Sequence, residues 1–215
     1  MTTAVCFDLD GTLFDDHQYV RGGLRHAGDV LTDRMGVELT DALLDAYFER
    51  GITESTFDTV LREHGQSTEL VPELVAAYHD NDAALRPFPE TVPTLETLIE
   101  EYRLGVITGG TNGRDKLDRL GLEEYFETVF VSPAYGSSKR EPEIFEAALD
   151  SLGVGPTEAI YVGDRPSLDF PQPNRLGMTT VHVTTSRYAE TEPTANAVPD
   201  HTIDTLDQLP RIINV

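Results

Sequence analysis

The chain opens with a short apolar run that stops abruptly at charged residues. Ala4 to Phe7 are all apolar, and Asp8-Leu9-Asp10-Gly11-Thr12 follows at once. A short run that is apolar at every position is typical of a parallel strand buried on both faces of a sheet. Ligands of open α/β sheets bind beyond the carboxyl ends of such strands. We therefore expect Asp8 and Asp10 at the edge of a parallel sheet where chemistry takes place.

Strand and helix patterns alternate in the second half of the chain. After Pro87, Pro89 and Pro93, the apolar residues Leu95, Leu98 and Ile99 form one helical face. Strands are predicted at 104–108, 129–132, 159–162 and 179–183, with an edge strand at 201–203, a helix at 144–152 and a closing helix at 206–215. This alternation predicts an α/β fold, with a Rossmann-like parallel sheet and helices on both of its faces.

A different period separates the first strand from the others. Between residues 16 and 85, apolar residues recur at helical spacing in four segments, divided by Gly36, Gly51 and Gly65. The segments carry Val20, Leu24, Ala27 and Leu31; Leu43, Leu44, Tyr47 and Phe48; Phe57, Val60 and Leu61; and Leu70, Leu74, Val75 and Tyr78. We expect an all-α helical-bundle cap at 16–85, inserted into a core domain formed by 1–15 and 86–215.

The charge balance excludes one class of partner. Thirty-eight acidic and sixteen basic residues give a formal net charge of −22, which would repel a polynucleotide backbone. The acids are spread along the whole chain, and the basic residues are fourteen arginines and only two lysines. We interpret this bias as adaptation to a very salty, halophilic cytosol, where ionic strength screens the repulsion. No nucleic-acid partner is expected.

The sequence also predicts no contact with a membrane. It has no basic leader before an apolar run, and no apolar stretch of roughly 18 to 20 residues that could span a bilayer. We expect a cytoplasmic monomer or homodimer. The single cysteine, Cys6, lies in the first apolar run and is expected to be a buried filler of the core.

Polar residues follow four of the predicted strands. They are Asp8 and Asp10 after the first strand, Thr108 after the second, Lys139 beyond the third, and Asp164 with Asp169 after the fourth. Because the carboxyl ends of parallel strands meet at one edge, these side chains should lie close together. Clustered carboxylates repel one another, so the site needs a divalent cation with a preference for oxygen ligands, and Mg²⁺ fits that chemistry. Lys139 would balance the remaining charge.

In this order and at these strand ends, the residues resemble the four motifs of the haloacid dehalogenase superfamily, in its phosphatase branch with a helical cap, which includes phosphoglycolate phosphatase-like enzymes. The matching segments are Phe7-Asp8-Leu9-Asp10-Gly11-Thr12, Ile107-Thr108-Gly109-Gly110, Lys139 before Pro142-Glu143-Ile144-Phe145, and Gly163-Asp164 with Asp169. The resemblance covers nearly the whole chain. It departs from the usual pattern at Arg140-Glu141-Pro142, at Arg165-Pro166 and at Pro171-Gln172-Pro173, where proline opposes a helix beyond its first turn.

The resemblance implies a role for each residue. Asp8 would attack phosphorus to form an aspartyl-phosphate, and Asp10 would act as general acid and then as general base. The Asp8 carboxylate, the Asp10 main-chain carbonyl and Asp164 would hold Mg²⁺, with Asp169 in support. Thr108, the Gly109 amide and Lys139 would bind the phosphoryl group.

These roles predict a hydrolase of small phosphorylated metabolites such as phosphoglycolate, sugar phosphates or nucleotides. A 2-haloacid dehalogenase of the same superfamily is disfavoured, because a halide leaves without the proton that Asp10 would supply. A sugar-phosphate mutase uses the same motifs and stays open as an alternative. From a different class, a non-catalytic phospho-accepting or phosphometabolite-binding regulator also remains possible. The branch of the superfamily that cleaves a carbon-phosphorus bond through an imine needs a lysine in the cap. It is excluded, because no lysine precedes Lys116.

Overall fold

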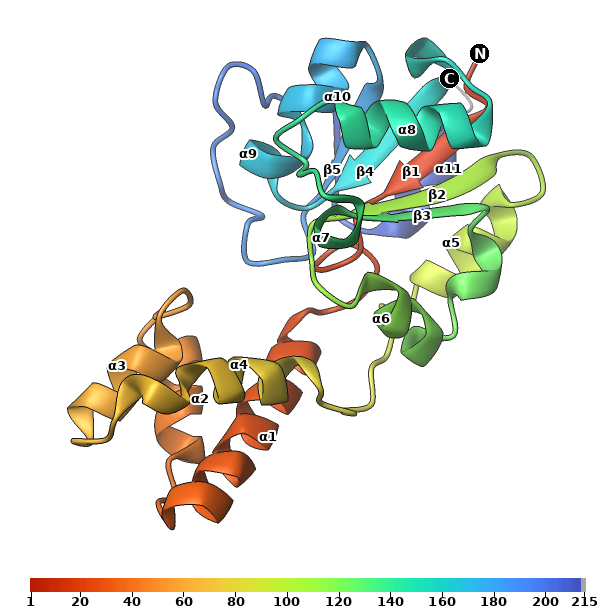
Figure 1. Cartoon of the computed structure of the whole chain (residues 1–215). Helices are drawn as coiled ribbons and strands as arrows, with labels where there is room; N and C mark the ends of the chain where they lie inside the picture. Colours follow the sequence, from red (N-terminus) through yellow and green to blue (C-terminus); the bar gives the residue numbers. More distant parts are fainter. Residues whose placement is uncertain (214–215) are drawn as a thin grey trace. The chain divides into compact units, whose positions relative to one another are not determined.

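The computed structural model describes residues 1–213 and divides the chain into two compact units (Figure 1). One unit combines residues 1–15 with the chain from Leu85 onward, and the other is Asp16–Ala84. The first unit is built on a sheet and the second is helical. That the helical unit acts as a cap over substrate stays a prediction.

The described residues form one sheet of six strands in the order β3-β2-β1-β4-β5-β6, and every neighbouring pair is parallel. The strands are β1 (Ala4–Phe7), β2 (Arg103–Thr108), β3 (Thr128–Val131), β4 (Ala159–Gly163), β5 (Thr179–Val183) and β6 (His201–Ile203). All four residues of β1 are buried, because strands flank it on both sides and helices cover both faces. The predicted parallel α/β sheet is confirmed.

Helices pack on both faces of this sheet, and Figure 1 shows α8 and α10 on one face and α5 on the other. The helices of this unit are α5 (Thr91–Leu98), α6 (Gly113–Leu120), α7 (Ser132–Tyr135), α8 (Glu143–Leu152), α9 (Pro166–Asp169), α10 (Pro171–Leu176) and α11 (Leu209–Ile213), with short 3₁₀ helices η2 (Glu123–Tyr125), η3 (Pro156–Glu158) and η4 (Leu206–Gln208). Beneath α8, Phe145 and Leu149 pack against Cys6 and Tyr161 of the sheet. Cys6 is fully buried, as expected of a core filler, and burial raises the pKa of its thiol to about 12.

Three details of the predicted strands and helices need correction. Ser132, predicted to end a strand, instead begins α7, because Pro133 follows it and suits a first helical turn. Ile99, predicted on a buried face, caps the end of α5 and is 46% exposed. The two prolines after Asp169 do not prevent a helix, since α10 starts at Pro171 and both prolines fall in its first turn. Of the predicted closing helix, residues 214 and 215 lie outside the described residues.

The helical unit contains α1 (His17–Met35), α2 (Thr40–Phe48), α3 (Thr56–Glu63), the 3₁₀ helix η1 (Thr68–Leu70) and α4 (Val71–His79). Leu24, Leu43 and Leu74 belong to its apolar core. Gly36 ends α1 with a φ of 66°, a left-handed conformation that glycine adopts without strain. Val75, predicted on the buried face of the fourth segment, is 41% exposed, because α4 turns Leu74 and Ala77 inward instead.

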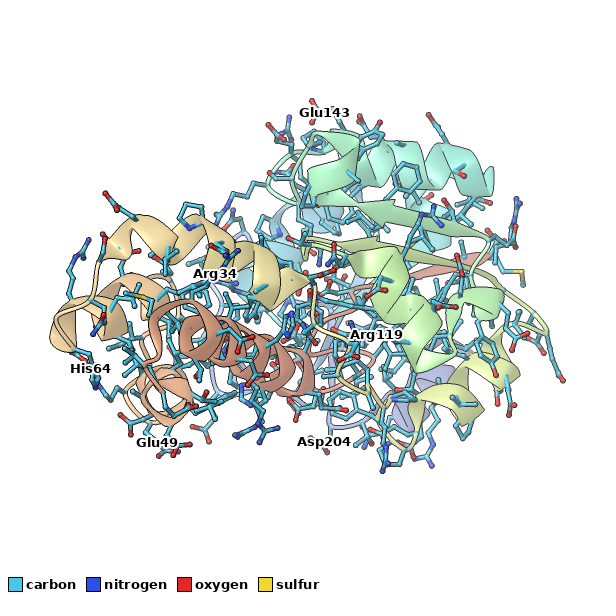
Figure 2. All side chains as sticks on the ribbon, turned by 60° about the horizontal axis from the view of Figure 1, so that its bottom comes forward. Arg34, Glu49, His64, Arg119, Glu143 and Asp204 are labelled. Carbon is cyan, nitrogen blue, oxygen red and sulfur yellow. The ribbon has the colours of Figure 1, made fainter. Side chains whose placement is uncertain are left out.

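Charged side chains cover the surface of both units. Figure 2 labels Glu49 in the helical unit and Glu143 in the sheet unit, and both are exposed. Arg34, also labelled, forms an exposed ion pair with Glu73 at 2.7 Å. Within residues 1–213, no helix combines the length and the apolar character needed to cross a bilayer.

Candidate active site

The first acidic residue of the site stands directly at the end of β1. The Asp8 amide donates to the Val162 carbonyl oxygen at 2.8 Å, which continues the parallel ladder by one residue and fixes the Asp8 backbone. The chain then turns at Gly11, whose φ is 83°. A Cβ atom at Gly11 would lie 2.4 Å from an Asp164 carboxylate oxygen, so only glycine lets Asp164 come so close to this turn.

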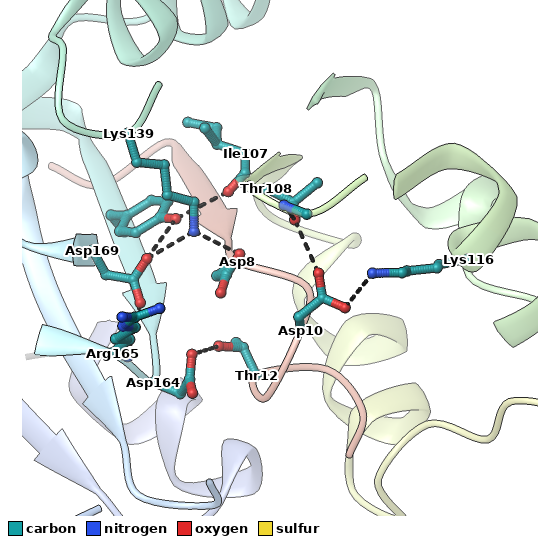
Figure 3. Close-up of polar contacts among 12 residues, drawn as sticks. Asp8, Asp10, Thr12, Ile107, Thr108, Lys116, Lys139, Asp164, Arg165 and Asp169 are labelled. Atoms are coloured by element: carbon teal, nitrogen blue, oxygen red, sulfur yellow. Dashed lines mark hydrogen bonds and ion pairs between the residues drawn. The ribbon is translucent and has the colours of Figure 1, made fainter. Parts of the chain in front are cut away.

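Three buried carboxylates gather at this edge (Figure 3). Asp8, Asp164 and Asp169 each offer an oxygen, and the three oxygens lie within 4.8 Å of one another. A Cβ atom at Gly163 would lie 2.6 Å from the Asp169 carboxylate, which explains the glycine before Asp164. Hard oxygen donors in a buried, negatively charged group fit a divalent cation such as Mg²⁺. The structure thus brings together the side chains of three of the four acids that were predicted at the metal, and the Asp10 carboxylate is not among them.

Lys139 lies inside the same cluster and is 1% exposed. Its Nζ is 2.6 Å from Asp8 Oδ1 and 2.7 Å from Asp169 Oδ1. Burial by itself lowers the pKa of Lys139, but the carboxylates of Asp169 and Asp8 outweigh it and raise the pKa above the ordinary range. Lys139 is therefore a permanent cation between two acids.

The loop that carries Lys139 is held by the residues that depart from the family pattern. The Glu141 carboxylate accepts hydrogen bonds from Ser137 Oγ at 3.0 Å and from the Ser138 amide at 2.9 Å. Gln172 Nε2 donates to the Arg140 carbonyl oxygen at 2.7 Å. Glu141 thus organises the turn before α8, and the Gln172 side chain from α10 braces it, so Lys139 is positioned without the usual sequence.

The electrostatic balance of Asp8 favours a bound cation. Burial raises the pKa of the Asp8 carboxyl well above its ordinary value, Lys139 opposes this, and the negative charges of Asp169, Asp164 and Asp10 add to it. One lysine does not offset so many acids. A divalent ion among these oxygens would reverse the balance and keep Asp8 ionised, the form that a nucleophile requires.

Sequence reasoning missed Tyr161, which lies fully buried below the cluster. Its hydroxyl donates to the Ile107 carbonyl oxygen at 3.0 Å and lies 3.4 Å from Asp169 Oδ1, and its ring centroid is 5.5 Å from Lys139 Nζ. Burial and then the nearby carboxylates raise the pKa of its hydroxyl well above the ordinary value. A tyrosine in a strand buried on both faces needs a polar partner, and that rule was the available signal.

Thr108 ends β2 next to β1 and is fully buried. The Gly110 amide donates to Thr108 Oγ1 at 3.1 Å, and this hydroxyl lies 3.4 Å from Asp10 Oδ2. A Cβ atom at Gly109 would meet no atom within 4 Å. Open space beside Gly109 is compatible with the predicted approach of a phosphoryl group to its amide, which stays a prediction.

Asp10 lies apart from the three clustered acids, on the opposite side of Asp8 in Figure 3. Asp10 was predicted to lie close to the other acids, and this needs correction. Because β1 ends at Phe7, Asp10 lies beyond the strand, and its side chain does not enter the cluster. Its Oδ1 is 2.6 Å from the Nζ of Lys116, a residue of α6 to which sequence reasoning gave no role. The rarity of lysine was the signal, because both lysines of the chain prove to lie in this site.

His182 of β5 packs against Phe170 with ring centroids 6.0 Å apart. Its Nε2 also lies 3.1 Å from the Asp164 main-chain oxygen. Burial lowers the pKa of this imidazole, so the ring is neutral and can donate from Nε2 to that oxygen. His182 thereby helps to fix the backbone of a clustered acid.

Comparison with known proteins agrees with this geometry. Residues 5–183 match the family model of haloacid dehalogenase-like hydrolases. Glyceraldehyde 3-phosphate phosphatase of Methanopyrus kandleri is 38% identical over an alignment of 218 positions, which covers 95% of this chain and 94% of that protein. A HAD phosphatase from Thermococcus onnurineus has a TM-score of 0.68 at 30% identity, covering 99% of this chain and 98% of its own. A 2-haloacid dehalogenase from Pseudomonas syringae has a TM-score of 0.73 at 27% identity, covering 100% and 99%.

The chain belongs to the haloacid dehalogenase-like hydrolase family, since the family model matches most of its length. Within that family it is a phosphatase, because relatives named as phosphatases align with it almost from end to end. The resemblance predicted from the four motifs is thereby confirmed. The role of each site residue stays a prediction.

Proposed function

We propose that the chain hydrolyses the phosphomonoester of a small phosphorylated metabolite through an aspartyl-phosphate on Asp8, with Mg²⁺ as cofactor. The observation that carries this proposal is the division of charge at the sheet edge. Asp8 shares Lys139 with Asp169, whereas Asp10 stands apart with its own lysine. Two carboxylates in different environments suit two different roles in one reaction.

Asp8 is the proposed nucleophile. Lys139 contacts its Oδ1, and Thr108 with Gly109 stands at the end of the neighbouring strand. A phosphoryl group in front of Asp8 could therefore meet the Lys139 ammonium, the Thr108 hydroxyl and the Gly109 amide. Donors fixed in this way stabilise the charge of a transferring phosphoryl group without reorganising during the reaction.

Mg²⁺ would be held by the carboxylates of Asp8 and Asp164 and by the Asp10 main-chain carbonyl. When bound, it neutralises phosphoryl oxygens and keeps Asp8 ionised. Asp169 fits a supporting place, because its Oδ1 accepts from Lys139 and its Oδ2 accepts from the Arg165 amide at 2.8 Å. Asp169 would thus orient Lys139 and the Asp164 loop.

Asp10 is the proposed general acid and base, and its presence favours phosphatase chemistry. An alkoxide leaving group needs a proton, whereas a halide does not, so the similarity to a 2-haloacid dehalogenase is assigned to the fold. After the first step, the ionised Asp10 would remove a proton from the water that attacks the aspartyl-phosphate. Retention of both acids also argues against a non-catalytic regulator.

The substrate class follows from the relatives. Several of them are named glyceraldehyde 3-phosphate phosphatase and align along most of the chain. We propose a phosphorylated metabolite of this size, with the helical unit 16–84 as the cap that limits access. The formal charge of −22, together with exposed acids such as Glu49, supports activity in a salty cytoplasm.

A phosphate-release screen tests the proposal. Wild type, Asp8→Asn and Asp10→Asn are assayed with Mg²⁺ in high salt against glyceraldehyde 3-phosphate, phosphoglycolate, sugar phosphates and nucleotides. We expect wild-type turnover of at least one substrate, and a loss of about 10⁴-fold or more in Asp8→Asn, as for other nucleophile deletions. Full activity in Asp8→Asn would refute the mechanism. Transfer of the phosphoryl group to a second hydroxyl of the substrate would indicate a mutase.

A further inference from the structure

Lys116, one of the two lysines of the chain, has no role in the proposed mechanism. Lys116 is buried, with its side chain 5% exposed, and its Nζ lies 2.6 Å from Asp10 Oδ1 (Figure 3). Asp10 is less buried, with 22% of its side chain exposed. An ammonium withdrawn from water is retained only where a partner or a function compensates for the lost hydration. The burial of Lys116 therefore indicates that its contact with Asp10 serves stability or function.

We propose that Lys116 is a positioning residue for Asp10: it holds the Asp10 carboxylate beside Thr108 and keeps it out of the coordination sphere of the cation. This inference rests on the proposed function, in which Asp10 is the general acid and base. It adds to that function a residue that touches neither the substrate nor the cation and acts through the Asp10 side chain.

The contacts around Asp10 fix the carboxylate from three directions. Oδ1 accepts from Lys116, and Oδ2 lies 3.4 Å from the Thr108 hydroxyl. A Cβ atom at Gly110 would lie 2.2 Å from Asp10 Oδ2 and 3.1 Å from Lys116 Nζ, so the bare backbone of Gly110 closes the third side. At Gly109, by contrast, a Cβ atom would meet no atom within 4 Å. The second glycine of the pair is thus required by the Asp10–Lys116 pair.

The helix that supplies Lys116 holds the base of its side chain rigidly. The Lys116 amide donates to the Asn112 carbonyl oxygen at 2.9 Å, and the next residue, Leu117, is fully buried. Asn112, the residue before α6, has a φ of 59°. This left-handed turn brings the first turn of α6 back toward the end of β2. The ammonium is therefore presented from a fixed element.

The charges of the site explain why Asp10 needs a lysine of its own. Asp8, Asp164 and Asp169 form the buried cluster, and Asp10 is near enough for its charge to act on Asp8. A divalent cation among the three clustered acids would attract any further carboxylate within reach. Asp10 is only two residues from Asp8, so its side chain is the natural competitor. Lys139 serves Asp8 and Asp169, and Lys116 serves Asp10. Lys139 thus holds acids of the cation cluster, and Lys116 holds the proposed general acid and base apart from that cluster.

A double-mutant cycle tests this assignment. Lys116→Met, Asp10→Asn and the double variant are assayed with Mg²⁺ on the best substrate from the screen. We expect Lys116→Met to lower kcat by about 10- to 100-fold with KM changed less than about 3-fold, because positioning acts on the transition state. In the Asp10→Asn background the same change should cause no further loss. Equal losses in both backgrounds, or a wild-type kcat in Lys116→Met, would overturn the proposal.

Calorimetric titration with Mg²⁺ alone gives a second readout. Freed from Lys116, the Asp10 carboxylate should become an additional ligand of the cation, so Lys116→Met should bind Mg²⁺ about 3- to 10-fold more tightly. This gain should vanish when Asp10 is Asn. If tightening is the same in both backgrounds, it reflects only the removed positive charge, and the proposed exclusion of Asp10 from the cation is wrong.

Three controls separate the possible causes of failure. Arg114→Met removes a cation from the same helix at an exposed position and should leave kcat and Mg²⁺ affinity unchanged. Lys116→Gln can still donate to Asp10 and should recover part of the kcat that Lys116→Met loses. If Lys116→Met folds poorly because it leaves the Asp10 charge unpaired, the double variant, which has neither charge, still allows the measurement. Full activity in Asp8→Asn and Asp10→Asn would defeat the proposed function itself. Impaired Asp10→Asn beside a normal Lys116→Met would defeat only the present inference.

Discussion

The two units of the molecule treat charge in opposite ways. At the edge of the sheet, Asp8, Asp169 and Lys139 are almost entirely withdrawn from solvent and contact one another. In the helical unit, ion pairs such as Arg50–Glu63 at 2.5 Å are about 40% exposed on both partners. The interior of that unit is built from apolar residues including Leu31 and Leu43. Both units are acidic on the surface, so the contrast lies in what each one buries.

This difference indicates where function has overridden stability. Moving charges out of water is unfavourable, and a buried pair is often no more stable than apolar residues of the same shape. An exposed pair gains little but also loses little hydration. The helical unit keeps such ion pairs exposed and has an apolar core, as expected where stability alone decides. The sheet edge departs from it, which is expected where carboxylates must meet a cation and a phosphoryl group.

The largest effect that would sharpen the contrast is expected for Lys139→Met. The change leaves Asp8 and Asp169 buried beside Asp164 without their cation, and breaking a buried pair in this way lowers the free energy of unfolding by about 3–5 kcal/mol. Denaturant unfolding in high salt without Mg²⁺ measures it. A stability equal to wild type would show that the lysine does not offset the acids.

A smaller loss is expected for Tyr161→Phe. The variant keeps the ring but leaves the buried Ile107 carbonyl oxygen without the hydroxyl that donates to it at 3.0 Å. Loss of a buried hydrogen bond beside a carboxylate such as that of Asp169 lowers the free energy of unfolding by about 1–3 kcal/mol. Because Tyr161 also lies near Asp169 and Lys139, kcat should fall with it. Unchanged unfolding would mean that the hydroxyl contributes nothing to the buried network.

Asp8→Asn should act in the other direction and stabilise the cation-free protein, by about 1–2 kcal/mol. The pKa of Asp8 is raised in the folded state, so the folded protein binds a proton at Asp8 more tightly than the unfolded chain does. Stability is therefore lost as pH rises through the unfolded value of about 3.9 toward the folded value. The advantage of Asn should be present at neutral pH and disappear in acid. A destabilised Asp8→Asn in chelator at neutral pH would contradict the sign.

The smallest effect is expected for Arg50→Met in the helical unit, the matched counterpart of Lys139→Met. The guanidinium pairs with Glu63 on the surface, where solvent and salt screen the interaction. In high salt its unfolding curve should overlay that of wild type within the error of repeat measurements. A loss comparable to that of Lys139→Met would break the contrast between the two units.

The sequence predicted the parts of the site that follow from strand ends. Asp8, Thr108 and Asp164 come directly after apolar runs, and the order of parallel strands then brings them to one edge. The positions of such residues depend mainly on local pattern and topology. The fold was predictable for the same reason, except at boundaries such as Ser132, where a turn residue decides between strand and helix.

The rest of the site depends on packing, which no local pattern encodes. Lys116 sits on an amphipathic helix whose spacing gives an ordinary polar position, and only the return of α6 toward β2 brings it to Asp10. Tyr161 sits in an apolar strand, and its partner Ile107 is 54 residues away in the sequence. Both contacts link elements that are distant in the chain, and both had a chemical signal, namely a rare lysine and a buried hydroxyl.

The central claim is that Asp8 carries the phosphoryl group, and trapping that group tests it most directly. Asp10→Asn lacks the proposed base for the second step. With an aryl phosphate as substrate and Mg²⁺ present, the phenolate leaves without a proton from Asp10, so the first step should still proceed. The aspartyl-phosphate should therefore accumulate and be trapped by an acid quench. Peptide mass spectrometry should then find the added mass of one phosphoryl group on the peptide that contains Asp8. It should be absent when Asp8 is also changed to Asn. A phosphoryl group on another residue, or turnover with none at Asp8, would contradict the account.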